Sequence, residues 1–177
     1  MVVRKEFYFV RHGQTDHNYA NLNSNQSENM PLNHIGRSQA HATLPIISKL
    51  PIRTICSSPL KRALETAKIL STGLEKDLQI IEDLAECSLH LWNEMTRFNN
   101  VSTLPFDGEI RSFINKVKKG IEQALTLPGP ILIVAHGGIH WVLCCLLSIK
   151  QHEWVIGNCI PVHFTCNAEL QWAAQRL

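Results

Sequence analysis

Short apolar runs occur at intervals along this chain and predict its strands. Such runs are rich in β-branched and aromatic residues and end at turn formers, a pattern typical of buried β-strands. They predict strands at residues 6–11, 52–56, 78–81 and 131–135, followed by a hairpin of 162–165 and 169–173. The longer segments between them predict helices at residues 34–49, 59–71, 109–127 and 139–147. Pro59 suits the first turn of its helix, and the run from Pro128 to Pro130 stops the helix before it.

The order of these elements predicts the fold class. Strands that alternate with helices indicate an α/β protein, a three-layer structure in which helices cover both faces of a mostly parallel central sheet. A chain of 177 residues suits one domain with a sizeable core, so we expect residues 1–177 to form a single domain. Two stretches lack a regular pattern. Residues 18–33 are rich in Asn and Ser and predict a loop, and residues 88–107 show no clear period.

Two histidines stand where predicted strands end. His12 closely follows the apolar run Phe7–Val10, and His136 directly follows the run 131–135. Parallel strands of an open α/β sheet deliver such residues to its carboxyl edge, where these sheets bind ligands. Arg11, next to His12, favours an anionic ligand. The pair therefore predicts phosphate chemistry.

Composition and charge exclude several kinds of partner. The net charge is only +2, and no basic stripe alternates with aromatic residues, which disfavours a nucleic-acid partner. The first residues run straight into the first predicted strand, which leaves no room for a signal peptide, and no apolar run is long enough to cross a bilayer. We therefore predict a cytoplasmic protein without nucleic-acid or membrane partners. The oligomeric state stays open.

The cysteines predict no metal or redox motif. The chain has six, and none forms a Cys-x-x-Cys pair, which disfavours a zinc ribbon or a thioredoxin-like site. Most have apolar neighbours and are expected to be buried free thiols. Cys87, beside Glu86, is the one expected to be exposed and reactive.

Six sequence blocks, in order from about Phe7 to Asn158, resemble those of the histidine phosphatase superfamily, in its phosphoglycerate mutase-like branch. The first is Arg11-His12-Gly13-Gln14-Thr15 with Asn18, and the last is Ala135-His136-Gly137-Gly138. The blocks between them are Pro31-Leu32 with Gly36 and Gln39-Ala40; Ser57-Ser58-Pro59-Leu60 with Arg62-Ala63 and Glu65-Thr66-Ala67; Leu84-Ala85-Glu86 with Trp92; and Gly108-Glu109. The resemblance implies phosphoryl transfer without a cofactor.

The resemblance makes His12 the nucleophile. A neutral imidazole nitrogen attacks phosphorus and forms a phosphohistidine, while an acceptor, commonly a backbone carbonyl, holds the other ring nitrogen. Glu86 is then the general acid, which protonates the leaving alcohol and later accepts a proton from the attacking water. That role needs a pKa raised by partial burial near Trp92 and other apolar residues. Nearby competitors for the role are Glu82, Asp83 and Glu94.

The resemblance assigns phosphate binding to residues of three blocks. Arg11 and Arg62 form a candidate clamp, because guanidinium forks match phosphate oxygens and stay charged. Arg62 also lies in the first turn of a predicted helix, near the positive end of its dipole. His136 would donate to an equatorial phosphoryl oxygen. Asn18 and the amide of Gly137 are further candidate donors.

Two residues have structural alternatives. By the resemblance Ser58 lies close to the pocket, and it could equally cap the helix that follows. His136 and His140 have the i, i+4 spacing of a helical metal pair, but no Glu follows His136 as in the zinc-protease motif. We therefore expect His140 to be a packed or capping residue and predict no metal or cofactor.

The chain departs from the family pattern around the predicted acid. His90 replaces a usual Gly, Asn93 and Glu94 replace a usual Glu-Gly, and Ile110 replaces a usual Ser. His90 is expected to be a partly exposed loop residue, although it could contribute to the pocket. These changes affect the expected substrate preference more than the phosphohistidine chemistry.

By the resemblance, residues 88–107 form a short cap over the pocket, and this cap favours hydrolysis. The segment is largely apolar, and Arg97 is its only fixed positive charge. A mutase that retains a bisphosphorylated sugar acid needs several cations beyond the clamp. We therefore predict a phosphomonoester hydrolase acting on a small phosphorylated substrate or a phosphoprotein, with a moderately apolar leaving group. Three alternatives stay open: a phosphoglycerate mutase-like phosphotransferase, a phosphohistidine protein phosphatase and a non-catalytic phosphate-binding module.

Overall fold

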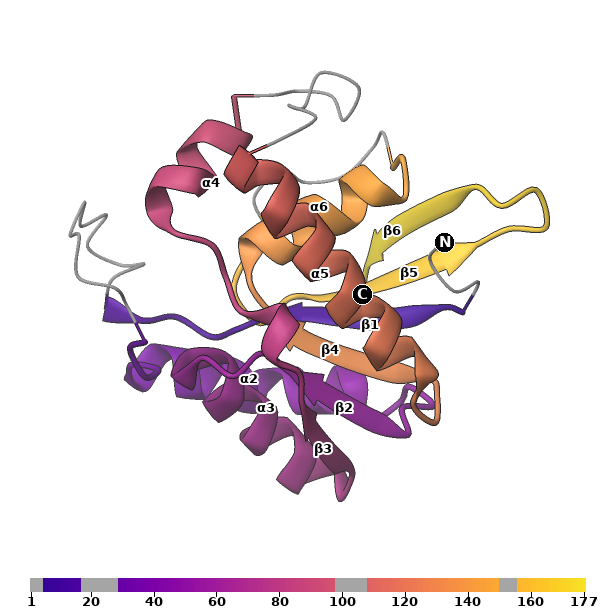
Figure 1. Ribbon diagram of the computed structural model, residues 1–177. Helices are drawn as coiled ribbons and strands as arrows, with labels where there is room; N and C mark the ends of the chain where they lie inside the picture. Colours follow the sequence, from indigo (N-terminus) through magenta and orange to yellow (C-terminus); the bar gives the residue numbers. More distant parts are fainter. Residues whose placement is uncertain (1–4, 17–28, 98–107, 150–155) are drawn as a thin grey trace.

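The structure is a computed structural model that describes residues 5–16, 29–97, 108–149 and 156–177 (Figure 1). Its strands are β1 (Phe7–Arg11), β2 (Thr54–Ser57), β3 (Asp77–Ile80), β4 (Ile131–Ala135), β5 (Pro161–Cys166) and β6 (Trp172–Arg176). Its helices are α2 (His34–Ile47), α3 (Lys61–Leu74), α4 (Leu89–Met95), α5 (Gly108–Thr126) and α6 (Gly137–Leu146), with a single 3₁₀ turn, η1 (Glu82–Leu84).

The strands in the described ranges form one six-stranded sheet in the order β3-β2-β4-β1-β5-β6. Strands β3, β2, β4 and β1 run parallel, while β5 is antiparallel to β1 and β6 is antiparallel to β5. The predicted mostly parallel sheet is thereby confirmed, and the two antiparallel strands are those of the predicted final hairpin.

Alternate residues of the central strands face opposite layers. On β1, Phe7 and Phe9 belong to the core cluster beneath α5 and α6, whereas Tyr8 and Val10 belong to the cluster beneath α2 and α3. Strand β4 divides its side chains in the same way. Because helices cover both faces, these strands appear in the sequence as uninterrupted apolar runs rather than as alternating ones.

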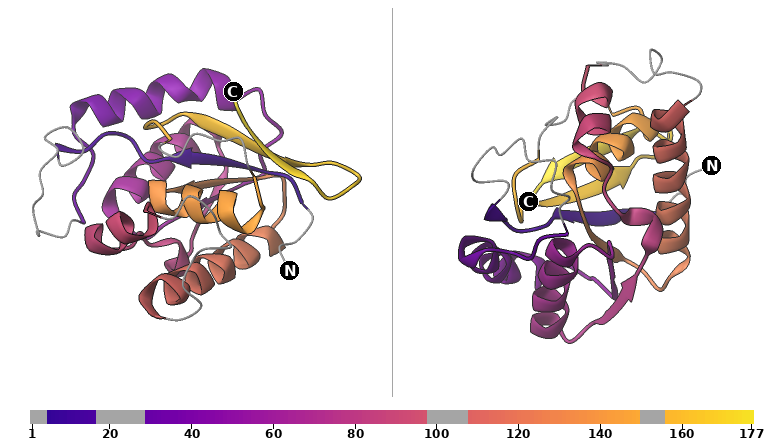
Figure 2. Two further views of the ribbon diagram at one scale, coloured as in Figure 1. Left: turned by 90° about the horizontal axis from the view of Figure 1, so that it is seen from above. Right: turned by 60° about the vertical axis from the view of Figure 1, so that its left-hand side comes forward.

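Two layers of helices enclose the sheet (Figure 2). Helices α2 and α3 lie on one side of it, and α5 and α6 lie on the other. Buried residues of α5 recur at spacings of three and four, including Ile110, Ile114, Val117 and Ile121, which is the pattern of a helix that packs one face on a core. The predicted three-layer α/β fold is confirmed. Within the described ranges, no helix combines the length and apolarity that crossing a membrane requires.

Helix α3 begins two residues later than predicted, at Lys61 rather than Pro59. The backbone N–H of Ser58 donates to Val134 O at 3.0 Å, and the N–H of Ile81 donates to Ser57 O at 2.9 Å. These bonds continue the sheet past the end of β2. The helix therefore begins only after Leu60, the N-cap.

Residues 88–107 contain a helix that the sequence pattern does not predict. Ser88 caps α4 by accepting a hydrogen bond from the N–H of Leu91 at 3.2 Å, and Leu91 and Met95 are buried four residues apart. A Ser before an i, i+4 apolar pair was the available signal, but the helix spans only seven residues. Residues 98–107 lie outside the described residues, so the single domain with a cap at 88–107 stays a prediction.

The final hairpin turns later than predicted. The side chain of Asn167 accepts hydrogen bonds from the N–H groups of Glu169 and Gln171, at 3.0 and 2.8 Å. This turn occupies the residues predicted to start the last strand, which therefore begins at Trp172. The ring of Trp172 packs on Phe7 with centroids 6.0 Å apart.

Candidate active site

His12 and His136 lie side by side at the carboxyl edge of the sheet. They follow β1 and β4, which are parallel neighbours, and the N–H of His12 donates to Ala135 O at 3.0 Å. Their ring centroids are 5.1 Å apart and their planes are inclined by 59°. His12 is only 3% exposed and His136 is fully buried. The sheet register therefore brings together the two histidines singled out in the sequence.

Two hydrogen bonds fix the tautomer of His12. Its Nδ1 lies 2.8 Å from the carbonyl oxygen of Gly13, and since a carbonyl can only accept, Nδ1 carries the proton. Its Nε2 accepts a hydrogen bond from Nε of Arg62 at 3.1 Å. Burial, followed by the charges of Arg62 and Arg11, lowers the pKa of His12 well below 6.5. The imidazole is thus neutral near pH 7, with its lone pair on Nε2.

Helix α3 positions both residues that bond to the His12 ring, Gly13 and Arg62. The hydroxyl of Thr66 accepts from the N–H of Gly13 at 3.0 Å and donates to the carbonyl of Arg62 at 2.8 Å. Gly13 also packs against the backbone of Gly36 at the start of α2, where a Cβ would collide with the Gly36 carbonyl. A side chain at position 13 would therefore displace the loop whose carbonyl orients His12.

Residues beyond β4 return to support the end of β1. The side-chain amide of Asn158 donates to His12 O at 2.7 Å, and the N–H of Cys159 donates to Arg11 O at 2.9 Å. No role for Asn158 is predicted from the sequence, because its position beside β1 arises from the antiparallel return of the chain and has no local signal.

Arg11 and Arg62 supply two positive charges next to His12. Nη1 of Arg11 donates to Ile156 O at 2.8 Å, while its buried Nε has no hydrogen-bond partner within the described residues. Burial lowers the pKa of Arg11, and the nearby charge of Glu86 opposes that shift. Arg62 is the second residue of α3 and bonds to His12 Nε2. Arg62 therefore contacts the nitrogen that would carry a phosphoryl group, and the charge of Arg11 acts on the same imidazole.

His136 bonds to the hydroxyl of Ser58. Its Nε2 lies 2.7 Å from Ser58 Oγ, which also accepts from the N–H of Leu60 at 3.3 Å. Ser58 thus contacts a site histidine and also helps start α3. The buried Nδ1 of His136 has no hydrogen-bond partner in the part of the chain that the structure describes. Burial, then the charge of Arg62, lowers the pKa of His136 well below 6.5.

The N-terminus of α6 opens directly after His136. Gly137 is its first residue, and the first N–H groups of a helix have no partner within the helix. These amides and the helix dipole favour an anion. Asn18, the other predicted donor, lies outside the described residues.

Glu86 reaches the same helix N-terminus. Its Oε2 accepts from the N–H of Gly138 at 3.0 Å. Its Oε1 accepts from the N–H of Cys87 at 3.1 Å and from the Cys87 thiol at 3.6 Å. Burial raises the pKa of Glu86 above its usual value, and these hydrogen bonds and the charge of Arg62 oppose the shift. The side chain therefore has the raised pKa that a general acid requires.

The three competing carboxylates have other surroundings. Asp83 pairs with Lys119 at 3.0 Å, and Glu94 pairs with His90 at 3.4 Å. Glu82 is exposed in η1. Of the four carboxylates considered, the structure joins only Glu86 to the first turn of α6.

The prediction that Cys87 is exposed and reactive is wrong. Its side chain is half-buried, and its thiol donates to Glu86. Burial, followed by the charge of Glu86, raises the pKa of this thiol, so the reactive thiolate is suppressed.

The departures from the family pattern lie in different surroundings. His90 is in the first turn of α4 rather than in a loop, and its side chain is 78% exposed beside Glu94. Ile110 is buried on α5 and belongs to the core cluster. Its apolar side chain therefore contributes to packing.

His140 is a packed residue. It is buried between aromatic rings, with centroids 5.6 Å from Phe9 and 5.8 Å from Phe164. Within the described ranges, no group of three or more His, Cys, Asp or Glu side chains is arranged to hold a metal ion.

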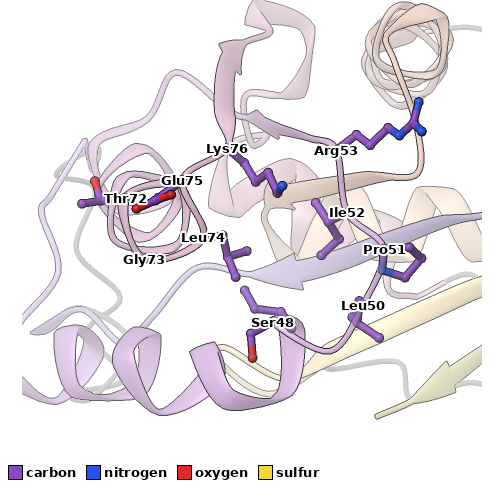
Figure 3. A pocket seen from close by; sticks show the side chains of 11 residues that line it. Ser48, Leu50, Pro51, Ile52, Arg53, Thr72, Gly73, Leu74, Glu75 and Lys76 are labelled. Carbon is purple, nitrogen blue, oxygen red and sulfur yellow. The ribbon is translucent and has the colours of Figure 1, made fainter.

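A separate hollow lies at the opposite end of the sheet (Figure 3). Its volume is about 580 Å³, and it is bordered by the carboxyl ends of α2 and α3 and by residues 50–53, which lead into β2. Arg53, Glu75 and Lys76 line it. It contains none of the predicted site residues.

The pairing of a neutral, arginine-bound His12 with a second buried histidine at one sheet edge agrees with comparisons to known proteins. The family model described as histidine phosphatase superfamily (branch 1) matches residues 7–176. The chain therefore belongs to the histidine phosphatase superfamily.

Individual relatives share less of the sequence. The chain is 31% identical over 173 residues to an agropine synthesis reductase of Rhizobium rhizogenes, a match that covers 90% of this chain and 39% of the reductase. It is 26% identical over 177 residues to glucosyl-3-phosphoglycerate phosphatase of Mycolicibacterium vanbaalenii, covering 86% of this chain and 78% of that protein. Among solved structures, mycobacterial hydrolase 1 superposes with a TM-score of 0.76 at 22% identity, covering 96% of both chains, and shares the fold.

Proposed function

We propose that this protein is a metal-independent phosphatase that hydrolyses phosphomonoesters through a phosphohistidine on His12. The carrying observation is the state of His12, whose Nδ1 proton is held by Gly13 O and whose Nε2 lone pair lies beside Arg62. A histidine held neutral between two guanidinium charges has the properties of a nucleophile for an anionic phosphate ester.

In the first step, Nε2 of His12 attacks phosphorus and the bond from phosphorus to the leaving oxygen breaks. Glu86 gives its proton to that oxygen, so the alcohol leaves neutral. Arg11, Arg62 and His136 border the equatorial oxygens and stabilise their charge, together with the amide of Gly137.

In the second step, water attacks the phosphohistidine. Glu86, now a carboxylate, takes a proton from the water, the bond from phosphorus to Nε2 breaks, and inorganic phosphate leaves. Both steps together restore neutral His12 and protonated Glu86.

The substrate class and location belong to the same proposal. The relative from Mycolicibacterium vanbaalenii is named as a phosphatase, which supports hydrolysis. The substrate is a small phosphorylated molecule or a phosphoprotein, with no nucleic-acid or membrane partner. The six cysteines are free, which suits a reducing compartment and supports a cytoplasmic location.

The first test is phosphate release from an aryl phosphate in the presence of a chelator, over roughly pH 5 to 8. His12→Ala removes the nucleophile and should lower kcat by at least about a thousandfold. His41→Ala, an exposed histidine of α2, is the matched control and should keep wild-type activity. Turnover that survives in His12→Ala, or that vanishes with the chelator and returns with metal, contradicts the proposal.

Product analysis separates the alternatives. A phosphoglycerate mutase would convert phosphoglycerate isomers faster than it releases phosphate. A phosphohistidine phosphatase has a good leaving group, so Glu86→Gln should slow hydrolysis of a phosphomonoester much more than that of a phosphoramidate. A non-catalytic module would bind phosphate without turning over any of these substrates.

A further inference from the structure

The two oxygens of the Glu86 carboxylate have different surroundings. Oε1 accepts two hydrogen bonds, from the N–H and the thiol of Cys87 at 3.1 and 3.6 Å. Oε2 accepts one, from the N–H of Gly138 at 3.0 Å. A carboxylate oxygen has two lone-pair positions. Within the described residues, Oε1 is therefore saturated, while Oε2 keeps one position for a proton.

The oxygen with the open position is also the one bound to α6. Gly138 is the second residue of that helix, next to Gly137 and two residues from His136. Oε2 is thus tied to the helix turn that borders both the histidine pair and the candidate phosphate donors. Oε1 is tied to the backbone and thiol of the residue that follows Glu86 itself.

Gly138 leaves room for this carboxylate. A Cβ at position 138 would collide with Glu86 Oε1 and would lie 3.0 Å from Cδ and 3.3 Å from Oε2. The backbone of Gly138 is helical, so no unusual dihedral angle requires glycine there. Glycine at position 138 instead leaves the space that the Glu86 carboxylate occupies.

We propose that Gly138 and Cys87 are positioning residues that orient Glu86 so that Oε2 exchanges the proton with the leaving group and with the attacking water. This inference rests on the proposed function. The amide of Gly138 fixes where Oε2 lies, and the two donors of Cys87 keep the proton off Oε1.

Leaving-group dependence tests the catalytic part. A displaced general acid slows the hydrolysis of substrates whose leaving group must be protonated. Gly138→Ala should therefore lower kcat for an alkyl phosphate by about a hundredfold. For an aryl phosphate with an acidic phenol, it should lower kcat only a few-fold. Gly129→Ala is the matched control, because a Cβ there meets only ordinary contacts, 3.7 Å from the nearest atom. An equal loss on both substrates overturns the proposal.

A double-mutant cycle on thermal stability tests the placement of Glu86 without an activity measurement. Gly138→Ala should lower Tm in the wild-type background, since its Cβ collides with the carboxylate. In the Glu86→Ala background the carboxylate is gone, so the same substitution should lower Tm much less. Equal losses in the two backgrounds overturn the proposal. A smaller loss of Tm in the Glu86→Ala background supports the placement of Glu86 even if the protein hydrolyses no phosphate ester. In that case the absence of turnover counts against the proposed function only.

Cys87 variants test the saturation of Oε1. Cys87→Ala removes one donor and should lower kcat for the alkyl phosphate several-fold, whereas Cys87→Ser keeps a donor and should recover most of the loss. Cys166→Ala, on the final hairpin, is the control and should match wild type. Equal activities of Cys87→Ala and Cys87→Ser overturn the role of the thiol.

Discussion

His12 lies 3.1 Å from the Arg62 guanidinium, and Arg11 adds a second positive charge nearby. Either charge disfavours an imidazolium, and burial disfavours it further. The same three influences act on His136. The site therefore holds its charge as two arginines and keeps both imidazoles neutral.

Removal of the Arg62 charge should raise the pKa of His12. Arg62→Ala takes away the second-largest cause of the lowered pKa, so His12 should titrate closer to 6.5. Arg62→Lys keeps a positive charge and should leave the pKa lower than Arg62→Ala does. Titration of the ring carbons by NMR measures both. An unchanged or lower pKa in Arg62→Ala would contradict the effect assigned to the Arg62 charge.

At the scale of the element, α3 links the site to the far end of the sheet. Its first turn carries Arg62, and its second contains Thr66, which bonds to the loop of His12. Its other end closes on Glu75, which adopts a left-handed conformation with φ of 51°. Non-glycine residues are disfavoured in this region.

Glu75→Gly should stabilise the protein by about 1 kcal/mol, because glycine adopts positive φ without strain. The expected rise in Tm is about 2–4 °C for a chain of this size. Ser48→Gly is the matched control, since Ser48 ends α2 in a right-handed conformation with φ of −63° and should gain nothing. Thermal melts of the two variants measure the difference. A lower Tm for Glu75→Gly would contradict the assignment of backbone strain at Glu75.

Elements with strong patterns could be predicted from the sequence, and those with weak ones could not. The apolar runs of β1 and β4 identify strands because helices cover both of their faces. Helix α4 is too short for a period to emerge, and the start of β6 depends on a turn held by one Asn side chain. Contacts such as Asn158 with His12 depend on tertiary structure alone.

At the scale of the whole molecule, the buried neutral histidines make stability depend on pH. The pKa values of His12 and His136 are lowered in the folded chain, so the unfolded chain binds more protons as the pH falls below 6.5. The free energy of unfolding should then fall by about 1.4 kcal/mol per pH unit for each histidine. Glu86 has the opposite sign, because its raised pKa favours proton uptake by the folded chain.

Urea denaturation at several pH values below 6.5 measures this slope. His136→Asn should reduce the slope by about 1.4 kcal/mol per pH unit, because the chain then takes up one proton fewer on unfolding. Equal slopes in wild type and His136→Asn would contradict the assignment of a neutral His136.

Strand β1 has a consequence for the newly made chain. It precedes the other described strands in the sequence, yet it lies between β4 and β5, and Val10 pairs with both Val134 and Pro161. Asn158 and Cys159 then fasten the residues that end β1. From the synthesis of β1 until that of β5 and β6, a nascent chain therefore carries His12 without these contacts, and its capacity to bind phosphate should appear only as the hairpin of β5 and β6 emerges.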